Sequence, residues 1–188
     1  MANTHHRKVL TEGVEAWNRW REENPHIQPD FSQRVNRVAT LTDLSLTGIN
    51  LRDADLSGAR LENLNLAESD LRGASLHSAR LRNVNLDGAD LSEADLRHSS
   101  LFGVSLRSSR LVRANFFRAS LGYGSKFHEA DCADAKFEDA VMYNDGESPG
   151  GIEGLSQQQV DSSSGNLATA LPPGLVKPRH WLLPSRSR

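Results

Sequence analysis

Leucine recurs at every fifth position along the middle of the chain. From position 41 to position 121, 17 consecutive positions in this phase hold sixteen leucines and one phenylalanine, Phe116. The residue two places before each of them is mostly small, and it is alanine in nine of the seventeen units. Polar residues and glycine fill most of the other positions. The chain therefore carries a five-residue repeat with two inward-facing positions in each unit.

A period of five fits neither an α-helix nor a straight β-strand. On a helix, successive leucines would step by about 140° and scatter around the circumference. On a strand they would point to opposite faces, because side chains alternate with a period of two. A backbone that turns once in every unit brings each leucine back to one interior, and the abundant Gly, Asn, Asp and Ser supply the turns. The repeat thus predicts an all-β solenoid.

At some units the position two residues before the leucine holds a bulky residue instead of a small one, and the spacing of these units gives the number of sides in each coil. Leu44, Leu64, Val84 and Val104 are bulky and recur at every fourth unit, whereas a period of three units would pair Leu44 with an alanine. Four units therefore make one coil, and coils would stack at the strand spacing of about 4.8 Å. The sequence predicts a quadrilateral β-helix of about five coils over residues 31–143. Side chains four units apart should stack, as Asn65 on Asn85, Asp70 on Asp90, and Glu93 on Arg113.

The phase of the repeat slips by one residue after Leu121. Gly122 and Gly124 flank the extra residue, which predicts a bulge absorbed at a corner. The next inward series is expected to be Phe127, Cys132, Phe137 and Met142.

Both ends of such a stack expose unpaired backbone groups and need caps. Residues 1–30 are predicted to form the N-terminal cap, as one helix from about 5 to 23 whose two tryptophans cover the first coil. Residues 144–188 are predicted to form a linker, a short C-terminal helix from 157 to about 163, and an extended arm. Ser156 and Gln159 have the spacing of a capping box at the start of that helix.

Composition narrows the class of protein. The 188 residues include 22 basic and 24 acidic side chains, and this near-neutral balance argues against a general nucleic-acid binder. A single cysteine cannot form an internal disulfide. No apolar stretch approaches the roughly 18 residues of a membrane span, and the N-terminus lacks the apolar core of a signal peptide. We therefore expect a cytoplasmic location, no membrane association and no direct nucleic-acid binding.

The charges are distributed in bands along the rod. Residues 41–96 carry ten acidic and five basic groups, residues 97–126 carry six basic and none acidic, and residues 127–147 carry seven acidic and one basic. Aromatic side chains accompany arginines in the basic band, a combination typical of interfaces, although scattered surface residues are the alternative interpretation. The candidate interaction patch consists of Arg97, His98, Phe102, Arg113, Phe117, Arg118 and Tyr123.

Motifs that carry chemistry are missing from the sequence. It contains no P-loop, GxSxG elbow or GxGxxG dinucleotide motif. Residues 128–132, HEADC, differ from HExxH in the second histidine, and Cys132 falls on an inward position, which favours a buried thiol over a metal ligand. His77 and His98 are interpreted as lone surface histidines. We expect no catalytic, cofactor-binding or metal-ligating residues, no cofactor and no enzymatic activity.

The units ADLSG, ARLEN, SDLRG, ADLSE and ADLRH resemble the A(D/N)LXX repeat of the pentapeptide repeat family. The resemblance extends over about 102 residues and implies a right-handed quadrilateral β-helix with the leucine and the small residue inside. The segment GVEAWNRWREENPHIQPDF also resembles a leader found on many bacterial members of that family.

Two functions are weighed for such a rod. The first is a non-enzymatic, rigid module that binds another protein of unknown identity, with a coil end or the C-terminal arm available for dimerisation. The second comes from the resemblance to gyrase-protecting members of the family, which suggests a DNA-mimicking modulator of DNA gyrase or topoisomerase. Mimicry needs a continuous negative surface, and the basic band over residues 97–126 interrupts it.

Overall fold

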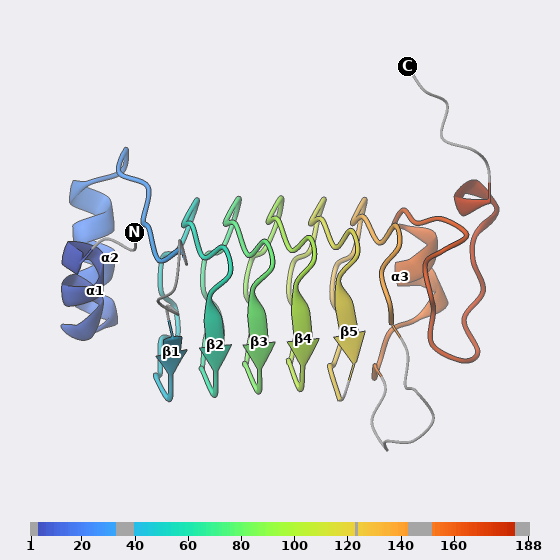
Figure 1. Ribbon diagram of the computed structural model, residues 1–188, viewed down its shortest axis with the longest axis horizontal. Coiled ribbons are helices and arrows are strands. Elements are labelled where there is room, and N and C mark those ends of the chain that lie inside the picture. Colours follow the sequence, from blue (N-terminus) through green and yellow to red (C-terminus); the bar gives the residue numbers. More distant parts are fainter. Residues whose placement is uncertain (1–3, 33–39, 123, 143–151, 183–188) are drawn as a thin grey trace.

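The protein is a straight rod with helices at both ends, as Figure 1 shows for the computed structural model, which describes residues 4–32, 40–122, 124–142 and 152–182. Five three-residue strands form one parallel sheet in chain order along the rod. The strands are β1 (Thr40–Thr42), β2 (Arg60–Glu62), β3 (Arg80–Arg82), β4 (Ser100–Phe102) and β5 (Ser120–Gly122). The helices are α1 (Thr4–Thr11), α2 (Val14–Glu23), α3 (Gln157–Asp161) and the short 3-10 helix η1 (Arg179–Trp181).

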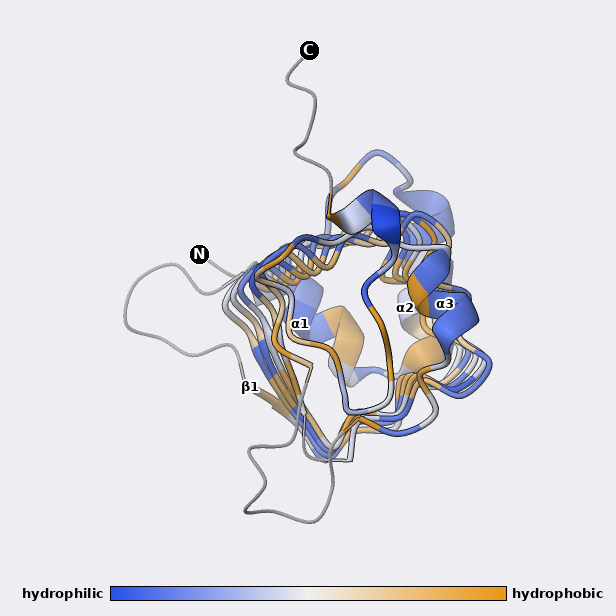
Figure 2. Ribbon diagram, turned by 90° about the vertical axis from the view of Figure 1, so that its right-hand side faces the viewer, coloured by the Kyte–Doolittle hydropathy of each residue, from blue (hydrophilic) through white to orange (hydrophobic). Residues whose placement is uncertain are grey.

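Each coil of the rod has four sides, one for each of four repeat units, as the sequence predicts. Leu41 is paired with Leu61, Leu61 with Leu81 and Leu81 with Leu101 in adjacent strands. The end-on view in Figure 2 shows the backbones of the coils superimposed in a square outline along the rod. From position 46 to position 121 the repeat leucines and Phe116 are almost fully buried, so they fill the interior. The fold is a right-handed quadrilateral β-helix, and the prediction of its class is confirmed.

The corners explain why one side tolerates bulky residues. In the described coils, the second residue after each inward leucine or phenylalanine adopts the left-handed conformation, with φ between 52° and 69° from Asp43 to Asp139. After leucines such as Leu46, Leu51 and Leu56, a backbone hydrogen bond of 3.0–3.1 Å closes the corner tightly against the small residue. The corners that follow β2, β3 and β4 have no such closing bond in the described residues. This wider corner accommodates Leu64, Val84 and Val104, which are buried there.

The polar residue before the leucine also has a structural role. The side-chain oxygen of Asp70 accepts a hydrogen bond from the Arg72 N–H at 3.1 Å, and Asn85 accepts one from Asp87 in the same way at 3.0 Å. These Asx turns satisfy a corner N–H and mimic a backbone turn. The preference for Asp or Asn at this position therefore follows from turn geometry.

The extra residue after Leu121 lengthens one coil. Bridges on either side of it join Ser105 to Lys126 and Ser120 to Val141, so these partners lie one position further apart than partners in the earlier coils. Tyr123, between the two glycines, lies outside the described residues. The predicted inward series is confirmed, because Phe127, Cys132, Phe137 and Met142 are all buried. Phe116 and Phe137 stack inside with ring centroids 5.0 Å apart.

The N-terminal cap differs from the single helix expected there. Gly13, with φ of 105°, separates α1 from α2, and this conformation favours glycine. Trp17 is fully buried, and its indole N–H donates to the Asn50 carbonyl at 2.7 Å. Trp20 packs against the same core at the edge of the cap. The tryptophans thus cover the first coil, as predicted, but from the second of two helices.

The cap covers only part of the first coil. The hydrogen bonds that the Trp17, Asn18 and Arg21 side chains make with the first coil all involve backbone atoms of residues 48–52. Leu44 lies before that range and is 40% exposed, although Leu64 at the same place in the next coil is 2% exposed. The expectation that this whole series faces a closed interior is therefore wrong for its first member.

The C-terminal segment contributes more than the predicted linker and arm, because residues 152–170 run parallel to the preceding coil. Bridges join Lys126 to Glu153, Lys136 to Ser164 and Val141 to Ala170. The capping box at Ser156 is present, but α3 ends at Asp161. Trp181 is buried over this last turn, where a Cβ on Gly165 would lie 2.5 Å from its ring. No helix among the described residues is long and apolar enough to cross a membrane.

Candidate protein-binding face

Four exposed or half-buried side chains form a row on one side of the rod. We call His77, His98, Phe117 and Arg118 the aromatic row. Their backbones follow the inward residues Leu76, Leu96 and Phe116 on three successive coils, so the stacking of coils sets their spacing. The Phe117 carbonyl accepts a hydrogen bond from the His98 N–H at 3.0 Å, which fixes neighbouring coils in this register.

The rings of the row contact one another edge to face. The His98 ring lies 5.5 Å from the His77 ring and 5.8 Å from the Phe117 ring, measured between centroids. The interplanar angles of 70° and 89° are the T-shaped geometry that aromatic pairs favour. The Arg118 guanidinium carbon lies 4.9 Å from the Phe117 ring centroid, within cation–π distance. These contacts therefore restrict the orientations of the four side chains of the row.

Ion pairs beside the row orient Arg118 and the neighbouring Arg97. Arg118 Nε donates to Asp139 Oδ2 at 3.1 Å, and hydrogen bonds from Asn166 and Arg118 hold the pKa of Asp139 below its usual value. Arg97 makes two hydrogen bonds to Asp95, of 2.8 and 2.7 Å. Burial pushes the pKa of Asp95 upward, but the hydrogen bonds from Arg97 outweigh it and the pKa is lowered. At neutral pH both carboxylates are ionised and the arginines are oriented.

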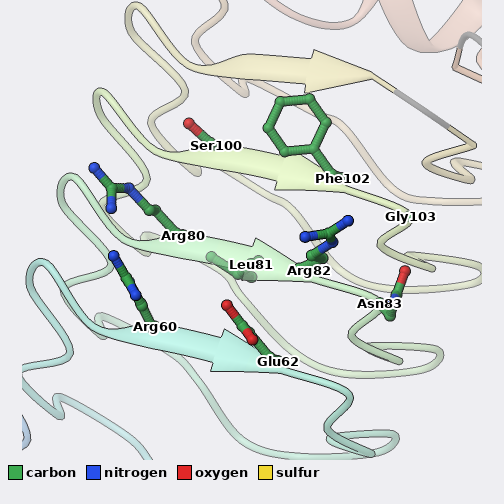
Figure 3. Close-up of a pocket in the computed structure, with 9 residues that line it drawn as sticks. All are labelled: Arg60, Glu62, Arg80, Leu81, Arg82, Asn83, Ser100, Phe102 and Gly103. Carbon is green, nitrogen blue, oxygen red and sulfur yellow. The ribbon is translucent and has the colours of Figure 1, made fainter. Parts of the chain in front are cut away.

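The structure brings together only part of the predicted patch. Arg97, His98, Phe117 and Arg118 share one side of the rod, as the repeat spacing implied. Arg113 lies at the preceding corner and pairs with Glu93 as predicted. Phe102 lies in β4 on the outer face of the sheet, beside Arg82 and Gly103 (Figure 3). Tyr123 lies outside the described residues.

His77 is the member of the row that the sequence interpretation missed. His77 and His98 are in ring contact, so their interpretation as lone histidines is wrong. Arg97 is the residue that stacks directly on His77 in the next coil, and His98 is the residue after it. Only the corner geometry turns the His77 and His98 rings toward each other. The repeat spacing could have suggested contact, but it does not give ring orientation.

The acidic ladders on the neighbouring side are largely neutralised by arginines. Arg72 pairs with Asp70 at 2.6 Å and reaches Asp90 at 4.0 Å, so the predicted Asp70–Asp90 stack contains a cation. Asn65 and Asn85 are paired in register as predicted, but the hydrogen bond between two amides joins Asn83 to Asn63 at 3.2 Å, and the Asn65 amide donates to Thr47. These carboxylates stabilise corners and ion pairs rather than forming an open negative face.

Cys132 has the buried environment expected from its inward position. Burial raises the pKa of its thiol to about 12, so the reactive thiolate is suppressed at neutral pH. Among the residues that the structure describes, no group of three or more His, Cys, Asp or Glu side chains is placed to hold a metal ion.

Similarity to known proteins is concentrated in the repeats. The family model for pentapeptide repeats matches with eight copies, over residues 39–73, 49–88 and 79–116. HetL, a pentapeptide repeat protein involved in heterocyst differentiation regulation from the cyanobacterium Nostoc sp. strain PCC 7120, is 30% identical, with 70% of this chain and 59% of that chain covered and a TM-score of 0.57. No curated protein sequence matches this chain.

Two other solved structures are more distant. A pentapeptide repeat protein from the Arabidopsis thaliana thylakoid lumen is 32% identical over 46% of this chain and 63% of its own, with a TM-score of 0.32. The plasmid-mediated fluoroquinolone resistance protein QnrB1 is 17% identical over 70% of this chain and 64% of its own, with a TM-score of 0.40. The chain therefore covers 59–64% of the length of these three solved proteins.

Proposed function

The repeats place this chain in the pentapeptide repeat family, and on that premise we propose that it is a non-enzymatic module that binds another protein through the aromatic row. The observation that carries the proposal is the row of three contacting rings and one arginine, displayed on a rigid stack of coils. Exposed aromatic residues and arginines are enriched at the energetic centres of protein interfaces.

Rigidity supports this function. Backbone hydrogen bonds of 2.7–3.2 Å join neighbouring coils on every side, so the row cannot spread or rotate freely. The ring contacts and the Arg118–Asp139 pair also restrict the side chains before binding. A partner therefore loses little affinity to the ordering of this surface.

The alternative function, mimicry of DNA toward gyrase or topoisomerase, has weaker support. A duplex presents one negative charge per about 1.7 Å of axis. Here Arg72 lies between Asp70 and Asp90, and Arg113 pairs with Glu93, so the acidic side of the rod is interrupted by cations. A supercoiling assay with purified gyrase and micromolar protein tests this alternative, which requires inhibition or protection of the enzyme.

The double substitution His98→Ala and Phe117→Ala tests the aromatic row. Val112→Ala is the matched control, because Val112 directly follows an inward leucine on the neighbouring side, as Phe117 follows Phe116. The wild type and the control should retain the same proteins from native lysate, quantified by mass spectrometry. The double variant should lose them by about tenfold or more, since two central interface side chains are removed.

Thermal unfolding provides the internal check on this experiment. All three proteins should unfold within a few degrees of one another, because His98 is exposed and Phe117 is only half-buried. Equal capture by the folded double variant and by the wild type would exclude the aromatic row as the binding surface.

A further inference from the structure

A groove runs across the outer face of the sheet, on a different side of the rod from the aromatic row. It has a volume of about 610 Å³ and is lined by residues of β2, β3 and β4 together with Asn83 and Gly103. Three of the lining side chains are arginines, Arg60, Arg80 and Arg82, and one, Glu62, is acidic. Figure 3 shows Arg60 and Arg80 extending from the same end of adjacent strands, while Arg82 rises beside the Phe102 ring.

The three arginines of this groove have no carboxylate partner among the described residues, and two of them stand next to each other. Arg60 and Arg80 are direct neighbours in the register of β2 and β3, so two positive charges stand side by side. Like charges directly opposite one another destabilise a sheet. No carboxylate of the described residues lies within ion-pair distance of the three groove arginines. Five other arginines of the rod pair with carboxylates, namely Arg52, Arg72, Arg97, Arg113 and Arg118, whereas Arg107 and Arg110 make no ion pair with any described residue.

We propose that this groove binds a small phosphate monoester, with the phosphoryl group held between Arg60 and Arg80. A phosphate dianion offers three strong acceptor oxygens, and each guanidinium presents a planar fork of N–H donors that matches them. All the basic residues of the groove are arginines, which bind phosphate with two hydrogen bonds each, rather than lysines, which act as point charges. The charge of the phosphate neutralises the pair of arginines that the fold sets side by side.

The size of the groove favours an ester over free phosphate. Its volume lies within the range of about 300–1,000 Å³ typical of small-molecule sites. Arg82 and Phe102 line its other end and offer planar groups toward an organic substituent. Arg82 lies two residues along β3 from Arg80, and Phe102 is the register partner of Arg82 in β4. Glu62 lies two residues along β2 from Arg60 and is paired in register with Arg82, and it forms no ion pair with Arg60 or Arg80 among the described residues.

Phenyl phosphate is the probe for this site, with inorganic phosphate and phenol as its separate halves. Binding to the full chain is measured by calorimetry and by the ³¹P resonance of the ligand. Arg80→Gln removes one half of the phosphoryl site. Arg107→Gln is the matched control, because it removes the same charge from an exposed arginine of another side that makes no ion pair among the described residues.

Wild type and Arg107→Gln should bind phenyl phosphate with equal affinity, and Arg80→Gln should bind it at least about tenfold more weakly. Phenol should not bind, and inorganic phosphate should bind more weakly than the ester. Equal weakening by both substitutions would mean nonspecific charge attraction and would overturn the site, as would the absence of saturable binding to the wild type. Equal affinities for inorganic phosphate and the ester would overturn the assignment of an ester. Because the aromatic row is intact in both variants, these outcomes are independent of the protein-binding proposal.

Discussion

The middle of the rod and its C-terminal turn form similar backbone ladders from very different sequences. Between β1 and β5, a leucine at every fifth position fills the interior of each coil. Residues 152–170 lack that period, contain α3 and still pair with Lys126, Lys136 and Val141 of the last regular coil. Backbone pairing needs only an exposed edge, whereas an interior enclosed by coils on both sides must be packed without voids. The repeat therefore encodes the packing of the interior, and the ends need only cover an edge.

The largest difference between the two regions should appear with a buried charge. Leu86 is fully buried in the middle of the rod, so Leu86→Asp places a carboxylate there without a partner. We expect a loss of about 4 kcal/mol or more in the free energy of unfolding, comparable with the whole stability of many domains. Circular dichroism should show no cooperative melt. Leu167→Asp in the C-terminal turn, where the leucine is 71% exposed, should melt like the wild type. A cooperative melt of Leu86→Asp at the wild-type temperature would contradict the inward assignment.

A smaller effect should distinguish equivalent positions in the first two coils. Leu64→Ala removes a buried side chain and should lower the free energy of unfolding by about 2–5 kcal/mol. Leu44→Ala changes the same place in its unit, but Leu44 is 40% exposed, and the loss should stay below about 1 kcal/mol. Urea unfolding of both variants measures the difference. Equal losses would show that the first coil is covered as completely as the second.

The smallest effect should be the acid sensitivity of the N-terminal cap. His6 is buried, and burial lowers the pKa of its imidazole below 6.5. Its Nδ1 accepts a hydrogen bond from the Asp30 N–H at 3.0 Å, so the neutral ring is the form that fits. The stabilisation is complete above about pH 6.5 and is lost as the pH falls toward the lowered folded pKa. The melting temperature should therefore fall by a few degrees between pH 7.5 and pH 5.

His6→Gln and His26→Ala separate this titration from others. His26 is exposed on the loop after α2, so His26→Ala should keep the wild-type pH dependence. His6→Gln should lose most of it, and the fluorescence of Trp17 and Trp20, whose rings contact His6, should become insensitive to pH in that range. An unchanged slope in His6→Gln would assign the acid sensitivity to another group.

The repeat spacing predicted which residues of the candidate site lie above one another on neighbouring coils, but it did not predict how their side chains are oriented. The four-unit period places Phe117 above Arg97 and Glu93 below Arg113, and both placements follow from the register of the coils. The contact between His77 and His98 depends on the left-handed corner at His98, which aims the ring across to the preceding coil. Arginine occurs at positions 60 and 80, four units apart, so the four-unit period also places these two residues side by side. That both lack a carboxylate partner follows from side-chain geometry.

The sequence alone determined the four-sided coil, its interior and the slip after Leu121, because each of these depends on which positions are apolar and how far apart they lie. Tertiary structure alone decided how far the N-terminal helices cover the first coil and that residues 152–170 add a parallel turn. These features depend on contacts between segments without a common period, where shape, hydrogen-bond geometry and the reach of individual side chains select the partner.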